Sequence, residues 1–161
     1  MPRLLWIDDE GERKFLFEAY KLRQEGWIVE WAVTVEEATA ALSTQPYDAV
    51  LLDQMMPLGG DGSHHVDVWT GCLVLWWLRR GHPPEAAPPL SIEASRVLWT
   101  TKALEENRRV PAICVSAFDD DEVMPVMQDA ADDGSLEVPM MVKPIRFPDL
   151  LAALSAVGDA Q

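Results

Sequence analysis

Residues 49–57 read Ala-Val-Leu-Leu-Asp-Gln-Met-Met-Pro, an apolar run that ends on the carboxylate of Asp53. Two other apolar runs end on charged residues in the same way: Leu4–Ile7 precedes Asp8 and Asp9, and Met140–Val142 precedes Lys143. In a parallel α/β sheet the carboxyl ends of the strands share one edge, where ligands gather. The pattern therefore predicts that three carboxylates and one ammonium meet at this edge.

Such a cluster indicates a metal site. Crowded carboxylates resist ionisation unless a cation offsets them, and a hard divalent ion prefers oxygen ligands. We therefore expect Mg²⁺ among Asp8, Asp9 and Asp53. Lys143 is too strongly cationic to bind a metal, but its ammonium suits a phosphate oxygen.

Strand and helix patterns alternate along the chain. The predicted strands are Arg3–Ile7, Trp27–Val33, Tyr47–Asp53, Val110–Val115 and Pro139–Val142. The predicted helices are Glu12–Gln24, a helix capped by Thr34 and ending near Thr44, Gly71–Arg80, Ser91–Asn107, the region Asp119–Asp132, and Arg146–Val157. This βαβαβ alternation is typical of the α/β class with a doubly wound parallel sheet.

The middle of the chain is irregular. Residues 58–70 are predicted to be an extended, glycine-rich loop, and residues 81–109 a proline-rich segment followed by the helix Ser91–Asn107. The helix Gly71–Arg80 is apolar on nearly every side, so it needs cover. The stripe that offers this cover consists of Ala94, Val97, Leu98, Thr101 and Leu104. The alternative is that the outer face of Gly71–Arg80 is a homodimer or effector surface.

Four elements in this order resemble the receiver domain of two-component response regulators. They are Leu-Leu-Trp-Ile-Asp8-Asp9-Glu10, Leu-Leu-Asp53-Gln-Met-Met-Pro57, Cys-Val-Ser116-Ala117 and Val-Lys143-Pro144. The resemblance covers residues 3–57 and about 109–157. It implies one receiver domain over residues 1–161: a flavodoxin-like, three-layer sandwich with a five-stranded parallel sheet and an extra helix inserted between the third and fourth strands.

The resemblance also implies a function. A receiver accepts a phosphoryl group from a phosphohistidine, and Asp53 would be the nucleophile. Asp9, Asp53 and the backbone carbonyl of Met55 would bind Mg²⁺ directly, and Asp8 through water. Lys143 and Ser116 would each contact a phosphoryl oxygen, and the Lys143-Pro144 peptide bond would be cis.

The implied partners are a sensor histidine kinase or phosphotransfer protein and an unidentified effector protein. Such a chain is a phosphoacceptor and not a turnover enzyme.

Two alternatives remain open. Met140 stands where family members usually carry an aromatic that moves on phosphorylation, which favours a pseudo-receiver that only binds partners. A Mg²⁺-dependent aspartyl phosphohydrolase would need a second carboxylate where this chain has Met55. His64 and His65 lie in the glycine-rich loop, where they are either solvated or a metal or proton-transfer pair.

Composition narrows the classes of partner. The 161 residues are 48% hydrophobic and carry a formal net charge of −14, which opposes direct binding to nucleic acid or anionic membrane. Two cysteines, Cys72 and Cys114, are too few for a disulfide framework, so we expect reduced thiols. The N-terminus has no apolar signal, and we expect a cytoplasmic protein.

Overall fold

The main sheet has five parallel strands. The computed structural model describes residues 1–57, 66–67, 70–81, 98, 101–117 and 139–158. Its sheet strands are β1 (Arg3–Ile7), β2 (Ile28–Ala32), β3 (Ala49–Asp53), β6 (Ala112–Ser116) and β7 (Met140–Val142). They lie in the order β2-β1-β3-β6-β7, and every neighbouring pair is parallel. The doubly wound parallel sheet predicted from the sequence is therefore confirmed.

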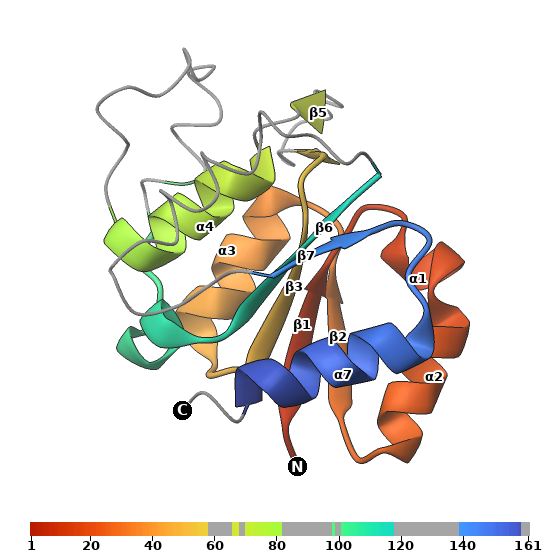
Figure 1. Cartoon of the computed structure of the whole chain (residues 1–161). Coiled ribbons are helices and arrows are strands. Elements are labelled where there is room, and N and C mark those ends of the chain that lie inside the picture. Colours follow the sequence, from red (N-terminus) through yellow and green to blue (C-terminus); the bar gives the residue numbers. More distant parts are fainter. Residues whose placement is uncertain (58–65, 68–69, 82–97, 99–100, 118–138, 159–161) are drawn as a thin grey trace.

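Helices cover both faces of the sheet (Figure 1). The helices α1 (Gly11–Lys14), α2 (Leu16–Gln24) and α7 (Phe147–Gly158) lie on one face, and α3 (Val35–Thr44) and α4 (Thr70–Arg80) on the other. All five residues of β3 are buried, as befits a strand covered on both sides. The predicted three-layer arrangement is confirmed.

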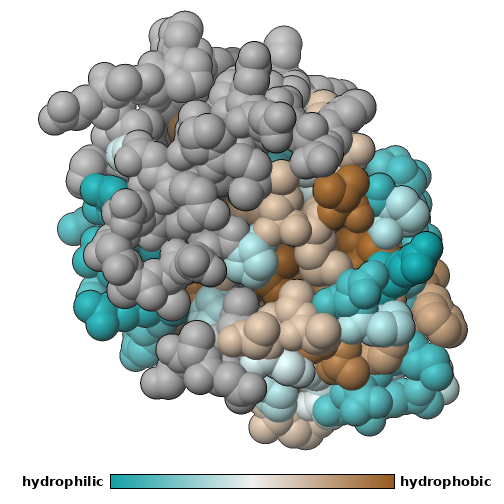
Figure 2. Space-filling model, viewed as in Figure 1, coloured by the Kyte–Doolittle hydropathy of each residue, from teal (hydrophilic) through white to brown (hydrophobic). Residues whose placement is uncertain are grey.

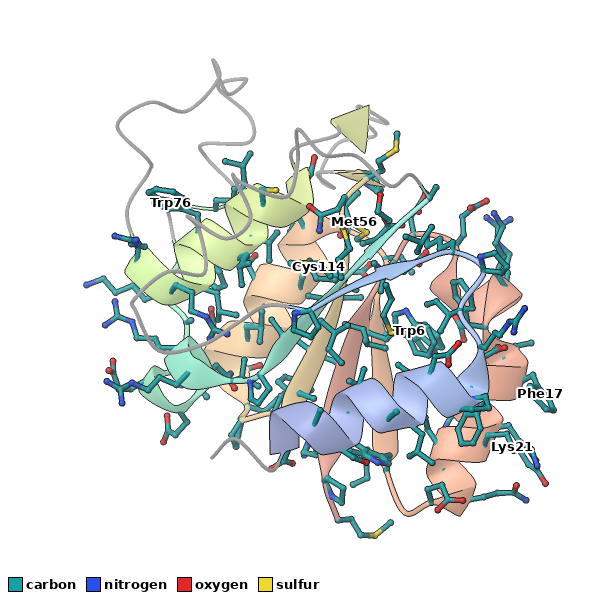
Figure 3. All side chains as sticks on the ribbon, in the orientation of Figure 1. Trp6, Phe17, Lys21, Met56, Trp76 and Cys114 are labelled. Atoms are coloured by element: carbon teal, nitrogen blue, oxygen red, sulfur yellow. The ribbon has the colours of Figure 1, made fainter. Side chains whose placement is uncertain are left out.

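Successive side chains of β3 enter two different apolar cores. Val50 and Leu52 belong to the core on the α3 and α4 side, whereas Ala49 and Leu51 belong to the core on the α2 and α7 side. This separation follows from the period of two along a strand. Figure 3 shows the labelled Cys114 and Met56 on the α4 side and Trp6 on the α7 side.

Local capping signals place two helices as expected. The Thr34 side chain accepts a hydrogen bond from the backbone N–H of Glu37 (3.1 Å), so Thr34 is the N-cap of α3. Gly26 adopts φ +90° just after α2, a conformation that favours glycine.

The predicted helix Glu12–Gln24 is two helices. Phe15 has φ −115° and ψ 27°, outside the helical region, and separates α1 from α2. Its ring is buried and stacks on Trp6 with the ring centroids 5.1 Å apart. The helix is therefore interrupted at Phe15, because the Phe15 ring packs against the sheet.

The segment after β3 also differs from the prediction. Residues 58–70 are not entirely loop, because β4 (Met56–Pro57) pairs antiparallel with β5 (Val66–Asp67), and Thr70 already begins α4. Eight of the eleven residues of α4 are buried, so little of this helix remains exposed. His64 and His65 lie outside the described residues.

The predicted helix Ser91–Asn107 is wrong in its last part. Residues 101–104 are not helical, and the 3₁₀ helix η1 spans Glu105–Arg109. Asn107 is fully buried: its amide donates to the carbonyls of Leu42 (2.8 Å) and Gln45 (2.7 Å), and its oxygen accepts from the Tyr47 N–H (2.9 Å). These distant partners favour a short helix at Asn107 over a continued one.

The segment between α4 and β6 contacts α4 where the structure describes it. Leu98 is fully buried in the same core as Trp77, and the Trp77 indole N–H donates to the Thr101 carbonyl (3.0 Å). This agrees with the predicted cover of the helix. That the segment is an insertion stays a prediction, and the predicted region Asp119–Asp132 lies outside the described residues.

Figure 2 shows one face of the molecule, where apolar residues gather over β7 and the adjoining part of α7. Val142 in β7 is 46% exposed. No helix among the described residues is long and apolar enough to cross a membrane.

Candidate functional site

Asp8, Asp53 and Lys143 meet at the carboxyl edge of the sheet. Asp53 ends β3, Asp8 follows β1 and Lys143 follows β7. The Lys143 ammonium donates a hydrogen bond to Asp53 Oδ2 (2.6 Å) and forms an ion pair with Asp8 Oδ2 (2.8 Å). The structure thus brings together these three residues, as the sequence predicts.

Backbone N–H groups hold the other oxygens of the two buried carboxylates. Asp8 Oδ1 accepts from the Glu10 N–H (2.9 Å), and Asp53 Oδ1 accepts from the Met55 N–H (3.1 Å). In each case the residue two positions later supplies the donor, which is the geometry of an Asx turn. Both carboxylates are therefore oriented by the first residues of the loop that follows their strand.

The carboxylates of the site outnumber its cations. Burial raises the pKa of Asp53, and the hydrogen bond from Lys143 offsets this only in part. Burial together with the nearby charges of Asp8 and Glu10 raises the pKa of Asp9. Burial disfavours the ammonium of Lys143, but its contacts with Asp53 and Asp8 outweigh burial and raise its pKa. One ammonium thus neutralises only part of the negative charge of these carboxylates, and a second cation would neutralise more of it.

The arrangement fits a divalent metal. Asp8, Asp9 and Asp53 each offer a carboxylate oxygen, and these atoms lie within 4.8 Å of one another. Asp8 Oδ2 is buried and contacts the Lys143 ammonium (2.8 Å), with no other hydrogen-bond partner among the described residues, so this oxygen can also face a metal ion. An all-oxygen set with few protein ligands suits Mg²⁺, which retains several waters.

The remaining predicted residues lie close in the fold. Ser116 is buried at the end of β6, one residue beyond the strand partner of Asp53, and its carbonyl accepts from the Lys143 N–H (2.8 Å). Met55 is half-buried directly after Asp53 and Gln54. The Lys143-Pro144 bond is cis, as predicted. That Ser116 and the Met55 carbonyl take part in the chemistry stays a prediction.

Aromatic rings lie beneath the charged groups. The Lys143 ammonium is 5.7 Å from the centroid of the Phe15 ring, which stacks on Trp6. Trp31 lies against Trp6 with the ring centroids 4.7 Å apart. A Cβ at Gly11 would come within 2.4 Å of the Trp31 ring, so glycine allows the loop after Asp8 to approach this cluster. An apolar floor strengthens the electrostatic interactions above it.

Sequence reasoning missed two residues next to the acceptor. Gln54 is 2% exposed, and Gly71 lies so close to β3 that a Cβ would be 2.4 Å from the Asp53 carbonyl oxygen. Their only signals in the sequence are a glutamine after a buried strand and a glycine near a helix start. Neither signal identifies the neighbour that each residue contacts.

Comparison with models of protein families finds no match, and neither does comparison with curated protein sequences. Solved structures do match. The receiver domain of Francisella response regulator 1452 is 20% identical with a TM-score of 0.65, over 99% of this chain and 98% of that chain. A CheY-like receiver domain protein from Methanospirillum hungatei is 19% identical with a TM-score of 0.64, over 99% and 94%.

A third match is a response regulator protein from Burkholderia pseudomallei whose structure has a phosphorylated aspartic acid and a calcium ion. It is 15% identical with a TM-score of 0.60, over 100% of this chain and 71% of that chain. At these identities the likeness concerns the fold, which is the flavodoxin-like fold of response regulator receivers. The fold implied by the four sequence elements is confirmed.

Proposed function

We propose that this chain is the phosphoaccepting receiver of a histidine-to-aspartate phosphorelay, with Asp53 as the acceptor. The observation that carries this proposal is the contact of 2.6 Å between the Lys143 ammonium and Asp53 Oδ2, within reach of the oxygens of Asp8 and Asp9. In a receiver fold, the acceptor would then lie beside both a phosphate-binding cation and a metal site.

The Asp53 carboxylate would attack the phosphorus of a phosphohistidine. One Asp53 oxygen forms the new P–O bond, and the P–N bond to the histidine breaks with its electron pair on the imidazole nitrogen. The Met55 N–H orients Asp53 through Oδ1, which limits the rotation of the carboxylate. Phosphoryl transfer needs little more from a protein than this positioning and the neutralisation of charge.

Lys143 would change its partner during transfer. It now pairs with Asp53 and Asp8, and it would turn to an oxygen of the incoming phosphoryl group. Ser116 would donate its hydroxyl to another of these oxygens. Asp9, Asp53 and the Met55 carbonyl would bind Mg²⁺ directly and Asp8 through water, and the bound ion would neutralise developing charge on the phosphoryl oxygens.

The proposed partners follow from this chemistry. A sensor histidine kinase or phosphotransfer protein would supply the phosphoryl group, and an effector protein would bind the phosphorylated form. The chain would accept one group per cycle, so we propose that it is not a turnover enzyme. The free thiols of Cys72 and Cys114 suit the reducing cytoplasm, where we place the exchange.

A pseudo-receiver is the second candidate, and Met140 favours it. Met140 is half-buried and packs against the core on the α3 and α4 side, where it pairs with Cys114 of β6. Methionine can occupy alternative pockets, but it lacks the ring on which the usual receiver switch depends. In this case the protein would bind its partner without regard to phosphorylation.

Incubation with acetyl phosphate and Mg²⁺, followed by mass spectrometry of the intact protein, tests the proposal. We expect the wild type to gain one phosphoryl group and Asp53→Asn to gain none. Unlabelled wild-type protein would favour the pseudo-receiver. Continuous release of inorganic phosphate would favour a phosphohydrolase, and full labelling of Asp53→Asn would refute Asp53 as the acceptor.

A further inference from the structure

Gln54 is a buried amide on the opposite face of the sheet from the acceptor. Side chains alternate along a strand, so the Asp53 carboxylate turns toward Lys143 while the Gln54 side chain turns toward α4. The core on that side consists of apolar residues, Cys72 and Leu73 of α4 among them. An amide in such surroundings costs free energy unless it is hydrogen-bonded.

All polar groups of Gln54 have partners, which lie on three different elements. Its backbone N–H donates to the Val115 carbonyl of β6 (3.1 Å), and its carbonyl accepts from the Gly71 N–H of α4 (3.2 Å). Its side-chain oxygen accepts from the Cys72 thiol (3.2 Å), and its side-chain nitrogen donates weakly to the Leu52 carbonyl (3.4 Å). Gln54 thus connects the end of β3 to both β6 and the first turn of α4.

The contact with α4 is unusually close. A Cβ at Gly71 would lie 2.4 Å from the Asp53 carbonyl oxygen and 2.8 Å from Gln54 Cα. The first turn of α4 therefore rests directly on the peptide unit that joins Asp53 to Gln54. The Gln54 carbonyl, which accepts from the Gly71 N–H, belongs to the same peptide unit as the Met55 N–H, which orients Asp53 Oδ1.

We infer that Gln54 is a positioning residue: through α4 it holds the backbone of residues 53–55, which orients the Asp53 carboxylate and presents the Met55 carbonyl to the metal. The inference rests on the proposed function. Burial alone does not account for a glutamine here, because an apolar side chain of similar shape would fill the same space without the cost of burying an amide.

The test compares Gln54→Met with the wild type in three measurements: unfolding in urea, Mg²⁺ binding by calorimetry without a phosphodonor, and labelling by acetyl phosphate at saturating Mg²⁺. We expect the urea midpoint to stay equal or rise. We expect Mg²⁺ affinity to fall about fivefold and the labelling rate roughly tenfold, since small misplacements of reacting groups slow a reaction strongly.

A pair of variants at Cys72 isolates the hydrogen bond. Cys72→Ser keeps a donor for the Gln54 oxygen and should preserve Mg²⁺ affinity, whereas Cys72→Ala removes the donor and should lower it as Gln54→Met does. Thr39→Val is the matched control, because it removes a buried hydroxyl from α3, and this hydroxyl donates to the nearby Glu36 carbonyl (3.0 Å). It should change stability alone.

Wild-type Mg²⁺ affinity in Gln54→Met would overturn the inference, as would a wild type that binds no Mg²⁺ at all. If the wild type binds Mg²⁺ but accepts no phosphoryl group, the proposed function fails, and the Mg²⁺ affinities still decide the role of Gln54. If Gln54→Met does not fold, the difference between Cys72→Ser and Cys72→Ala decides it: equal affinities in that pair would overturn the inference.

Discussion

Two polar clusters lie at opposite edges of the same sheet, and they differ in how their charges balance. The carboxyl-edge cluster is Asp8, Asp9, Asp53 and Lys143, with three carboxylates and one ammonium. The amino-edge cluster is Arg3, Glu30, Gln45 and Tyr47, with one carboxylate and one guanidinium. The first cluster therefore holds an excess of negative charge, and the second is neutral.

The hydrogen bonds show the same contrast. Both Glu30 oxygens are engaged, one by Arg3 and the other by Gln45 and by the Tyr47 hydroxyl (2.9 Å). At the carboxyl edge, by comparison, Asp8 Oδ2 (2.8 Å) and Asp53 Oδ2 (2.6 Å) share the single ammonium of Lys143. A cluster whose charges balance stabilises the fold, whereas carboxylates that outnumber the cations beside them mark a candidate cation-binding site. Removing equivalent groups from the two edges should therefore have different consequences.

Loss of the cation should give the largest difference between the edges. Lys143→Gln removes the ammonium beside Asp53, and we expect phosphorylation by acetyl phosphate to slow about a hundredfold, as when an enzyme loses one group that stabilises transition-state charge. Arg3→Gln, which removes the cation of the amino edge, should label at the wild-type rate. Equal rates in the two variants would remove the functional distinction between the clusters.

Mg²⁺ should stabilise the protein through the carboxyl edge alone. At a Mg²⁺ concentration ten times its Kd, a ligand that binds only the folded state adds about 1.4 kcal/mol to the free energy of unfolding. We expect this gain in the wild type and in Glu30→Gln, and a much smaller gain in Asp9→Asn. Thermal unfolding with and without Mg²⁺ measures it, and an undiminished gain in Asp9→Asn would argue against Asp9 as a ligand.

Without Mg²⁺, removing a carboxylate should have opposite signs at the two edges. Glu30→Gln should lower the free energy of unfolding by about 1 kcal/mol, because Arg3 and Tyr47 lose a charged partner. Asp9→Asn should raise it by less than about 0.5 kcal/mol, since the half-exposed Asp9 is screened by solvent. Urea titrations of both variants in buffer with chelator provide the comparison.

The Asp9 effect should also depend on pH. The pKa of Asp9 is raised above its ordinary 3.8, so its contribution to stability is favourable below that pH and is lost as the pH rises through the folded-state pKa. The advantage of Asp9→Asn should therefore grow as the pH rises from acidic to neutral. A constant advantage would show that charge is not its cause.

Tyr47 should give the smallest effect, and only in alkali. Burial and the hydrogen bond to Glu30 raise its pKa from 10.0 to about 12. A raised pKa means that the contribution of Tyr47 to stability is complete below pH 10 and is lost toward pH 12. We expect the stability difference between wild type and Tyr47→Phe to be constant below pH 10 and to shrink above it. A difference that stays constant to pH 12 would contradict the pKa shift.

The carboxyl edge could be predicted from the sequence because its pattern is simple. Asp8, Asp53 and Lys143 each directly follow or end an apolar run, and the geometry of a parallel sheet then brings such ends together. No knowledge of side-chain packing is needed for this step. The same holds for α3, whose cap Thr34 and first-turn glutamates are local signals.

The incorrect predictions concern residues whose conformation depends on contacts with residues distant in the sequence. Phe15 interrupts a helical pattern because its ring packs on Trp6, and the helix predicted to reach Asn107 stops earlier because Asn107 bonds carbonyls 62 and 65 residues away. The contact of Gln54 could not be predicted for the same reason, since its partner Cys72 is 18 residues further along the chain. Local propensity cannot report a partner that only the folded chain supplies.

The short strand β7 can separate from the sheet more easily than the central strands can. It is an edge strand of three residues, it pairs with β6 through Cys114, Val115 and Ser116, and Lys143 follows it directly. Opening this one strand would withdraw the ammonium from Asp53 while the central strands remain paired. The amide proton of Lys143, bonded to the Ser116 carbonyl (2.8 Å), therefore reports the integrity of the site. Its hydrogen-exchange rate measures how often the acceptor loses its cation.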